Sequence, residues 1–196
     1  MHGLVLRTIQ VFITDTYGPQ AWKDTAALAE LDSADIEAML QYPPDIPERL
    51  LSAAYAVLAK PGDALLEDVG TYLVTHPNSQ ALRRLLRFGG TDFIEFLHSL
   101  DDLPDRARLA VADLVLPDLE LLDHDNGSFD LRIGASLPGF GAVMLGVLRA
   151  IADDYGSLAL LDHSRLAQGE EMIHITVVDT SYAEGREFDL SAKVPG

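Results

Sequence analysis

Hydrophobic residues recur at intervals of three and four through the first 112 residues, which is the spacing of one face of an amphipathic helix. The clearest case is the stretch 91–112, whose recurring residues are Phe93, Phe96, Leu97, Leu100 and Leu103. Pro104 follows this series directly. Proline lacks a backbone N–H and clashes with the preceding turn, so either the helix kinks at this point or a new helix begins there. The simplest interpretation is a break between two core helices.

The same spacing predicts a series of helices separated by proline and glycine turns. The expected helices span residues 2–16, 19–31, 47–60, 64–76, 79–88 and 91–112. Gly18 and Pro19 separate the first two, because glycine suits the end of a helix and proline suits the first turn of the next. We expect Trp22 to anchor the second helix in the core and Asp63 to cap the fourth.

After Pro117 the spacing changes to the alternation of strands. Asn126-Gly127 is a strong hairpin signal, and the residues on either side of it alternate between apolar and polar. A helix over 140–155 and two further strands over 157–163 and 171–179 follow. The sequence therefore predicts an α+β fold, in which a bundle of about six helices precedes an antiparallel sheet half with the order strand–strand–helix–strand–strand.

We expect one domain over residues 1–180, with a helical part (1–112) and a sheet part (113–180), and a flexible tail over residues 181–196. The chain has 196 residues, 48% of them hydrophobic, and no cysteine. The missing thiols exclude disulfides and cysteine metal sites, and they are compatible with a reducing cytoplasm. The opening segment is interpreted as a helix of the domain rather than a signal peptide, and no apolar stretch is long enough to span a membrane.

The formal net charge of −17 narrows the classes of partner. Nucleic acids and anionic lipid surfaces require clustered lysine and arginine, so the sequence predicts neither nucleic-acid nor membrane binding. A strongly acidic surface favours a basic protein partner. The acidic residues are spread along the chain, which is typical of a solvated surface.

Catalytic motifs are absent from the sequence. The six histidines are scattered and form no metal-binding pair on a helix. Asp123-His124-Asp125 is a weak metal-binding candidate beside the hairpin turn, and a metal-dependent enzyme is the least favoured hypothesis. We therefore expect a binding domain and not an enzyme.

Several segments, taken in order, resemble the haem–nitric oxide/oxygen binding (H-NOX) family of sensor domains. The segments are MHGLV with TYGPQAW near the start, FLHSLDDLPDRA at the helix break, Pro117, and GFGAVMLGVLRAIADDYG after the hairpin. The resemblance covers roughly residues 1–180. It implies haem b as the cofactor, nitric oxide sensing, and a pocket lined by Val5. It also implies a signalling partner such as a histidine kinase or a cyclic-dinucleotide enzyme.

The family residues that hold haem are replaced in this chain. The family places the histidine that ligates the iron where this sequence has Pro104, and its Tyr-x-Ser-x-Arg motif for the haem propionates falls on Ile133, Ala135 and Leu137. The first hypothesis is therefore an H-NOX-like regulatory domain that has lost standard haem ligation. It would act through a partner or bind a different apolar small molecule.

The second hypothesis is a haem gas sensor with a substitute ligand, for which His98 is the candidate. On a continuous helix, six residues separate His98 from Pro104 by about 240° and about 9 Å, so its side chain would point away from the position of the family ligand. Arg132 neighbours Ile133 on the predicted strand and would face the opposite side of the sheet. The arginines at 83, 84 and 87 would reach propionates only in a rearranged pocket.

Overall fold

The computed structural model describes residues 1–185, which form α-helices, two short 3-10 helices and one four-stranded sheet. The α-helices are α1 (Gly3–Tyr17), α2 (Pro19–Leu28), α3 (Asp45–Leu58), α4 (Gly62–Thr75), α5 (Gln80–Arg87), α6 (Phe93–His98), α7 (Leu103–Ala110) and α8 (Phe140–Tyr155). The strands are β1 (Leu119–Asp123), β2 (Ser128–Ile133), β3 (Leu158–Arg165) and β4 (Glu171–Asp179), and the 3-10 helices are η1 (Pro77–Ser79) and η2 (Ala167–Gly169).

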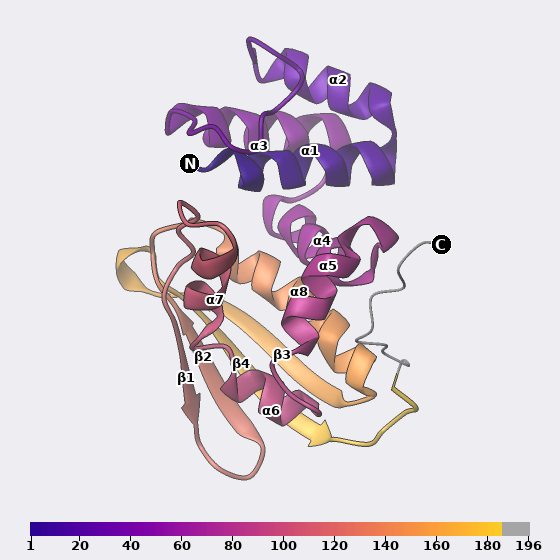
Figure 1. Cartoon of the computed structure of the whole chain (residues 1–196), viewed down its shortest axis with the longest axis vertical. Coiled ribbons are helices and arrows are strands. Elements are labelled where there is room, and N and C mark those ends of the chain that lie inside the picture. The colour runs from indigo at the N-terminus through magenta and orange to yellow at the C-terminus, as the bar shows by residue number, and fades with distance from the viewer. Residues whose placement is uncertain (186–196) are drawn as a thin grey trace.

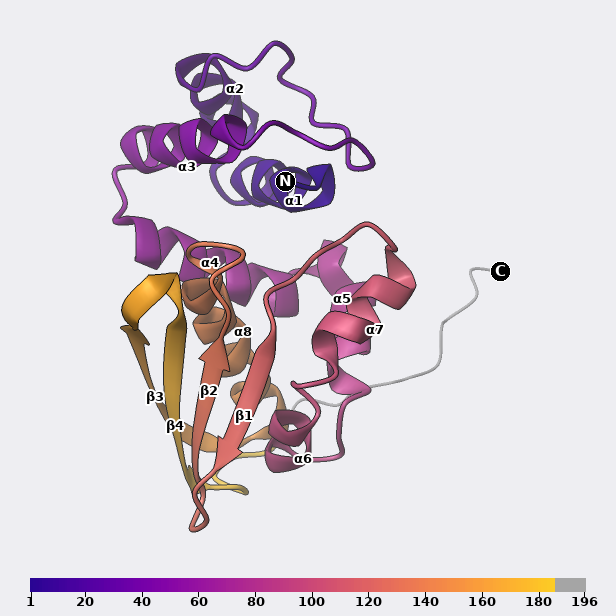
Figure 2. The ribbon, with the colours of Figure 1, turned by 90° about the vertical axis from the view of Figure 1, so that its left-hand side faces the viewer.

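The helices form layers on one end and one face of the sheet. Helices α1, α2 and α3 lie together at one end of the molecule, and α4 lies between them and α8 (Figure 1). The sheet has the strand order β1-β2-β4-β3, and every neighbouring pair is antiparallel. Figure 2 shows the sheet extending away from the α1–α3 layer, with α8 behind it. The predicted α+β fold with an antiparallel sheet is confirmed.

Two hydrophobic cores meet at α4. The first core is formed by α1, α2, α3 and the loop before α3, together with Leu65, Val69 and Tyr72 of α4. The second core is formed by α5 to α8 and the inner face of the sheet, together with Val74 near the end of α4. Helix α4 therefore contributes to both cores, and the two cores are held together through this one helix.

Helices α4 and α8 touch through their backbones. A Cβ atom added at Gly70 would overlap the carbonyl oxygen of Val143, and one added at Gly146 would overlap the carbonyl oxygen of Glu67. Such an approach is possible only for residues without a side chain. The two glycines thus bring α4, the helix that contributes to both cores, into direct contact with α8.

The predicted break at Pro104 is the start of a new helix. Helix α6 ends at His98, and α7 begins at Leu103 with Pro104 in its first turn, where the missing N–H has no intrahelical partner to lose. Phe93, Phe96 and Leu97 of α6 are buried as predicted. The break between two core helices, which was the simplest interpretation, is therefore present, and seven α-helices precede the sheet where about six were expected.

Two local predictions in the first 70 residues need correction. Helix α3 begins at Asp45, so Pro47 lies within its first turn. Helix α4 begins at Gly62, so Asp63 is a first-turn residue rather than a cap, and its carboxylate pairs with Arg165 of β3. On α1 the fully buried leucine is Leu6, whereas Leu4 and Val5 are half-buried.

The hairpin around Asn126-Gly127 is confirmed. Residues 125–127 all have positive φ, and Leu121 of β1 faces Leu131 of β2. The backbone N–H of Ala183 donates to Gly156 O, so the chain returns to the end of α8 after β4. The predicted tail lies largely outside the described residues. Among residues 1–185, no helix has the length and hydrophobicity to cross a membrane.

Candidate functional site: a cavity at the junction of the helical layer and the sheet

A cavity of about 1040 Å³ opens between the α1–α3 layer and the adjacent end of the sheet. Its walls come from the N-terminus and α1, from α3, from the segment that leads into α4, from the α7–β1 connection, from the β2–α8 connection and from β3. This volume lies just above the range of about 300–1,000 Å³ that is typical of small-molecule sites. The cavity is therefore large enough for a ligand of substantial size.

Most of the wall is apolar and rigid. Met1, Val5, Leu51, Leu66 and Leu137 contribute aliphatic side chains from four different segments. Four prolines complete this surface, namely Pro44, Pro47, Pro61 and Pro138. Because proline fixes its own φ angle, these segments have few ways to collapse into the space.

The charged groups of the wall are mostly acidic. Glu48, Asp63 and Asp113 line the cavity, against the single side-chain cation Arg165. Arg165 forms an ion pair with Asp63, and the N-terminal ammonium donates to the carbonyl oxygen of Tyr42 at 2.8 Å. Both cations of the wall are therefore engaged by protein oxygens.

Tyr55 stands beside this ion pair. Burial raises the pKa of the Tyr55 phenol, the neighbouring Asp63 carboxylate raises it further, and Arg165 lowers it. The phenol therefore remains neutral, and it adds a hydroxyl group to a wall that is mostly apolar.

His2 is the buried polar group of the wall. Its side chain is 6% exposed, and its Nδ1 accepts a hydrogen bond from the backbone N–H of Leu4 at 3.1 Å, which caps α1. An atom that accepts from an N–H carries no proton itself, so the neutral ring has its proton on Nε2. Iron or another metal would need an unprotonated Nε2, so the cap keeps His2 in the form that does not ligate.

The five family positions are not gathered around the cavity. Val5 and Leu137 line it. Pro104 is buried in the first turn of α7, and Ile133 is fully buried in the second core, where it faces Leu119 and Glu171 across the sheet. Ala135 is exposed in the connection after β2. None of these side chains has an atom that could bind iron or a carboxylate.

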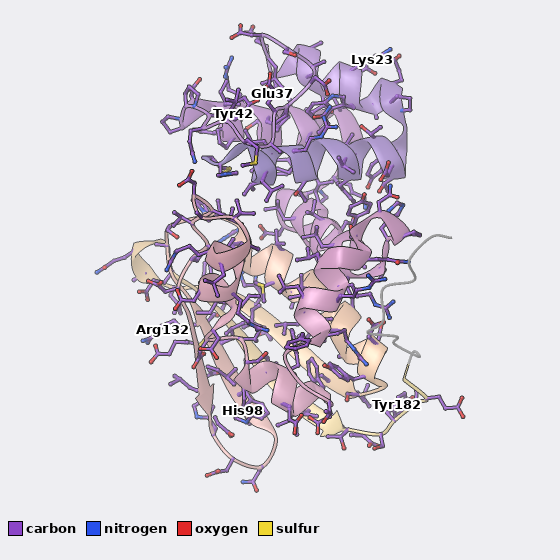
Figure 3. The ribbon with its side chains drawn as sticks, viewed as in Figure 1. Lys23, Glu37, Tyr42, His98, Arg132 and Tyr182 are labelled. Carbon is purple, nitrogen blue, oxygen red and sulfur yellow. The ribbon has the colours of Figure 1, made fainter. Side chains whose placement is uncertain are left out.

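His98 and Arg132 lie away from the cavity. Figure 3 shows His98 beside α6, at the end of the molecule away from the α1–α3 layer. The His98 Nε2 is 3.5 Å from Asp123 Oδ2, and the His98 ring makes a T-shaped contact with Phe129. The angle of about 240° between His98 and Pro104 assumed one continuous helix. Helix α6 ends at His98, so that angle does not apply to the folded chain. Arg132 is exposed beside Glu120, on the face opposite the buried Ile133, as the alternation predicted. Ligation of iron by His98 stays a prediction.

The remaining candidate groups are held by other partners. Arg83 donates to Asp154 Oδ2 at 2.7 Å, and the Arg87 guanidinium stacks 3.8 Å from the centre of the Tyr155 ring. His124 and His174 both bond Asp130, so His124 does not point toward a metal site with Asp123 and Asp125. Within residues 1–185, no group of three acidic or histidine side chains is placed to hold a metal ion.

These residues do not fit haem. A haem needs an axial ligand and partners for two propionates, and the wall offers a capped histidine, an arginine already paired with Asp63, and further acidic groups. Sequence reasoning missed His2, Tyr55 and Arg165 as members of this site. For His2 a signal existed, because it directly precedes an amphipathic stretch where a capping residue is expected.

Comparisons with known proteins agree with the fold. A family model described as Haem-NO-binding matches residues 2–160. The soluble guanylate cyclases gcy-31 of Caenorhabditis elegans and 89Db of Drosophila melanogaster are 22% and 18% identical over 154 and 158 residues, which are 79% and 81% of this chain. The chain spans 22% and 24% of the length of these two relatives.

Solved structures show the same fold. The Fe(II) unliganded H-NOX protein from K. algicida superimposes with a TM-score of 0.79 at 18% identity, covering 94% of this chain and 100% of that one. An H-NOX protein from S. oneidensis in the Fe(II)NO state gives a TM-score of 0.72 at 15% identity, covering 91% and 100%. With a family model matched over most of its length, the chain belongs to the Haem-NO-binding family and is an H-NOX domain related to those of soluble guanylate cyclases.

Proposed function

We propose that this H-NOX domain is a regulatory domain that works without standard haem ligation and acts through a signalling partner. The observation that carries the proposal is Pro104, which the sequence resemblance aligns with the family's iron ligand and which is buried in the first turn of α7. Proline has no atom that can bind iron. The loss of the propionate motif at Ile133, Ala135 and Leu137 points in the same direction.

The electrostatics of the cavity also support this proposal. Haem brings two carboxylates, and burying a carboxylate without a cationic or hydrogen-bonding partner is costly. Arg165 would have to leave Asp63 to serve one propionate, and Glu48 and Asp113 would repel both. A chain adapted to haem would carry free cations at this place.

A partner protein is the natural recipient of the signal. The relatives named above are guanylate cyclases, of which the matched region is a minor part. For this chain a guanylate cyclase, a histidine kinase or a cyclic-dinucleotide enzyme is the proposed class of partner. The net charge of −17 favours a partner with a basic docking face.

Haem reconstitution tests the proposal. One equivalent of ferrous haem is added to the full chain under reducing conditions, and the visible spectrum is recorded before and after nitric oxide and after gel filtration. We expect the spectrum of free haem, with the haem lost on the column. A sharp, shifted Soret band that persists after gel filtration at one haem per chain would refute the proposal, and the variants His98→Ala and His2→Ala would then identify the ligand.

A further inference from the structure

We propose that the cavity binds an uncharged lipophilic molecule that carries a hydrogen-bond acceptor, with His2 as its polar anchor. This inference rests on the proposed function, because the same space cannot hold haem at the same time. It deepens that function by naming the chemical class of the ligand. The argument has three steps, which concern the donor, the charge and the shape of the cavity.

The donor is the Nε2–H of His2. The side chain is 94% buried, and the bond from Leu4 N–H to Nδ1 fixes both the ring orientation and the proton on Nε2. No hydrogen bond from Nε2 to another residue of 1–185 is present, although the residue lines the cavity. A ligand with a carbonyl, ether or hydroxyl oxygen would accept from this donor in the place of water, which gives the cavity one directed polar contact to offer.

The charge of the wall selects against anions. Glu48 and Asp113 have no cationic partner among the ion pairs of the described residues, and Asp63 already holds Arg165. A fatty acid or another anionic amphiphile would bring its carboxylate next to these groups, and like charges repel, although solvent screens the exposed Glu48 and Asp113. A neutral amide, ester or ketone with the same apolar body avoids this penalty and still accepts from His2.

The shape suits a bulky apolar body. Leu51, Leu66, Val5 and Leu137 form the apolar surface, and the four prolines hold the segments that carry it. A preformed apolar cavity loses little conformational freedom on binding, so burial of the ligand is converted efficiently into affinity. The walls also belong to both halves of the fold, because α1 and α3 face the β2–α8 connection across the space. A bound ligand therefore bridges the helical layer and the sheet half.

The test uses Nile red, a neutral dye with a carbonyl oxygen whose fluorescence rises in apolar surroundings. Dye binding is titrated on the full chain, and bound dye is then displaced by oleamide or by oleate, which share one hydrocarbon tail and differ in the charge of the head group. We expect saturable binding and a displacement constant at least about tenfold lower for oleamide than for oleate. Equal displacement by the two would overturn the assignment to uncharged ligands.

Variants locate the dye. Leu51→Trp and Leu137→Trp fill the cavity from opposite walls, and we expect each to weaken Nile red at least about tenfold. Leu109→Trp, at a position that is 90% exposed and outside the cavity, is the matched control and should leave binding unchanged. His2→Asn keeps a capping side chain for α1 while removing the ring donor, and it should weaken oleamide by about threefold to tenfold.

The outcomes separate this inference from the proposed function. Absence of saturable dye binding, or binding that both tryptophan variants leave intact, would overturn the ligand assignment alone. Haem retained by the wild-type chain in the reconstitution assay would overturn the proposed function, whatever the dye does. Loss of the dye in both cavity variants, with normal circular dichroism and with the control unaffected, would support the cavity as the site.

Discussion

Gly70→Ala tests the backbone contact between α4 and α8. The added methyl group would overlap the carbonyl oxygen of Val143 and lie 2.9 Å from the backbone nitrogen of Val147. Neither atom can be moved by a change of rotamer, because both belong to the backbone of a well-packed helix. Overpacking a core costs about 1–3 kcal/mol, and contacts with immobile atoms belong at the upper end of that range.

The helical propensity of alanine works against this cost. Replacing glycine in a helix interior by alanine stabilises the helix by about 1 kcal/mol. The net change in the free energy of unfolding is therefore a loss of about 2 kcal/mol, which for a chain of this size lowers Tm by about 4–8 °C. Gly146→Ala, which meets Glu67 from the other side, should behave in the same way.

Urea denaturation followed by circular dichroism at 222 nm measures the effect. Thr71→Ala is the matched control, because Thr71 is the next residue of α4 and its side chain is exposed. The Thr71→Ala variant gains helix propensity and adds no atom against α8, so we expect its free energy of unfolding to rise by about 0.5 kcal/mol. A Gly70→Ala variant as stable as the wild-type chain, or more stable, would refute the close approach of the two helices.

Three further predictions concern single hydrogen bonds. The hydrogen bond from the Tyr72 hydroxyl lowers the pKa of Asp15, so the stabilisation from this pair is present above about pH 4 and is lost as the pH falls through the folded pKa of Asp15. Tyr72→Phe should therefore lower the free energy of unfolding at pH 7 but not at pH 2. Thermal melts at the two pH values measure this difference. The hydrogen bond with His174 is the largest cause of the lowered pKa of Asp130, so His174→Ala should raise this pKa more than His124→Ala does, and an NMR titration showing the reverse order would contradict this assignment. Trp22 donates from Nε1 to Ala34 O at 2.7 Å within the first core. Trp22→Phe should therefore lower the free energy of unfolding, measured by urea melts, by about 1–2 kcal/mol. An unchanged urea midpoint would count against Trp22 as an anchor.

The elements were predictable where local chemistry decides them. The Asn126-Gly127 hairpin depends on residues that tolerate positive φ, and the helix over 140–155 was predicted with the bounds that the structure has. The break at Pro104 also follows from local chemistry, but the pattern alone did not decide between a kink and a new helix. That choice depends on how Phe96, Leu97 and Leu103 pack in the second core, which is a tertiary property.

The cavity could not be predicted in the same way. Its wall combines segments from Met1 to Arg165, and the sequence does not state which connections meet at one end of a sheet. The role of Asp63 illustrates the difficulty, since a capping position was expected and a pairing with Arg165, 102 residues away, is found. The replacement of the family positions is a prediction that the sequence alone supplied, whereas the unpartnered donor of His2 required the fold.

The shared position of α4 has a consequence for the order in which the chain folds during synthesis. Every member of the first core lies between residues 1 and 73, so this core is complete in sequence once α4 has been made. The second core needs β4, which begins about 100 residues later, at Glu171. Chains are made from the N-terminus, and segments with local contacts fold early. We therefore expect the first core with α4 to be the template on which α8, with Gly146 against α4, docks late.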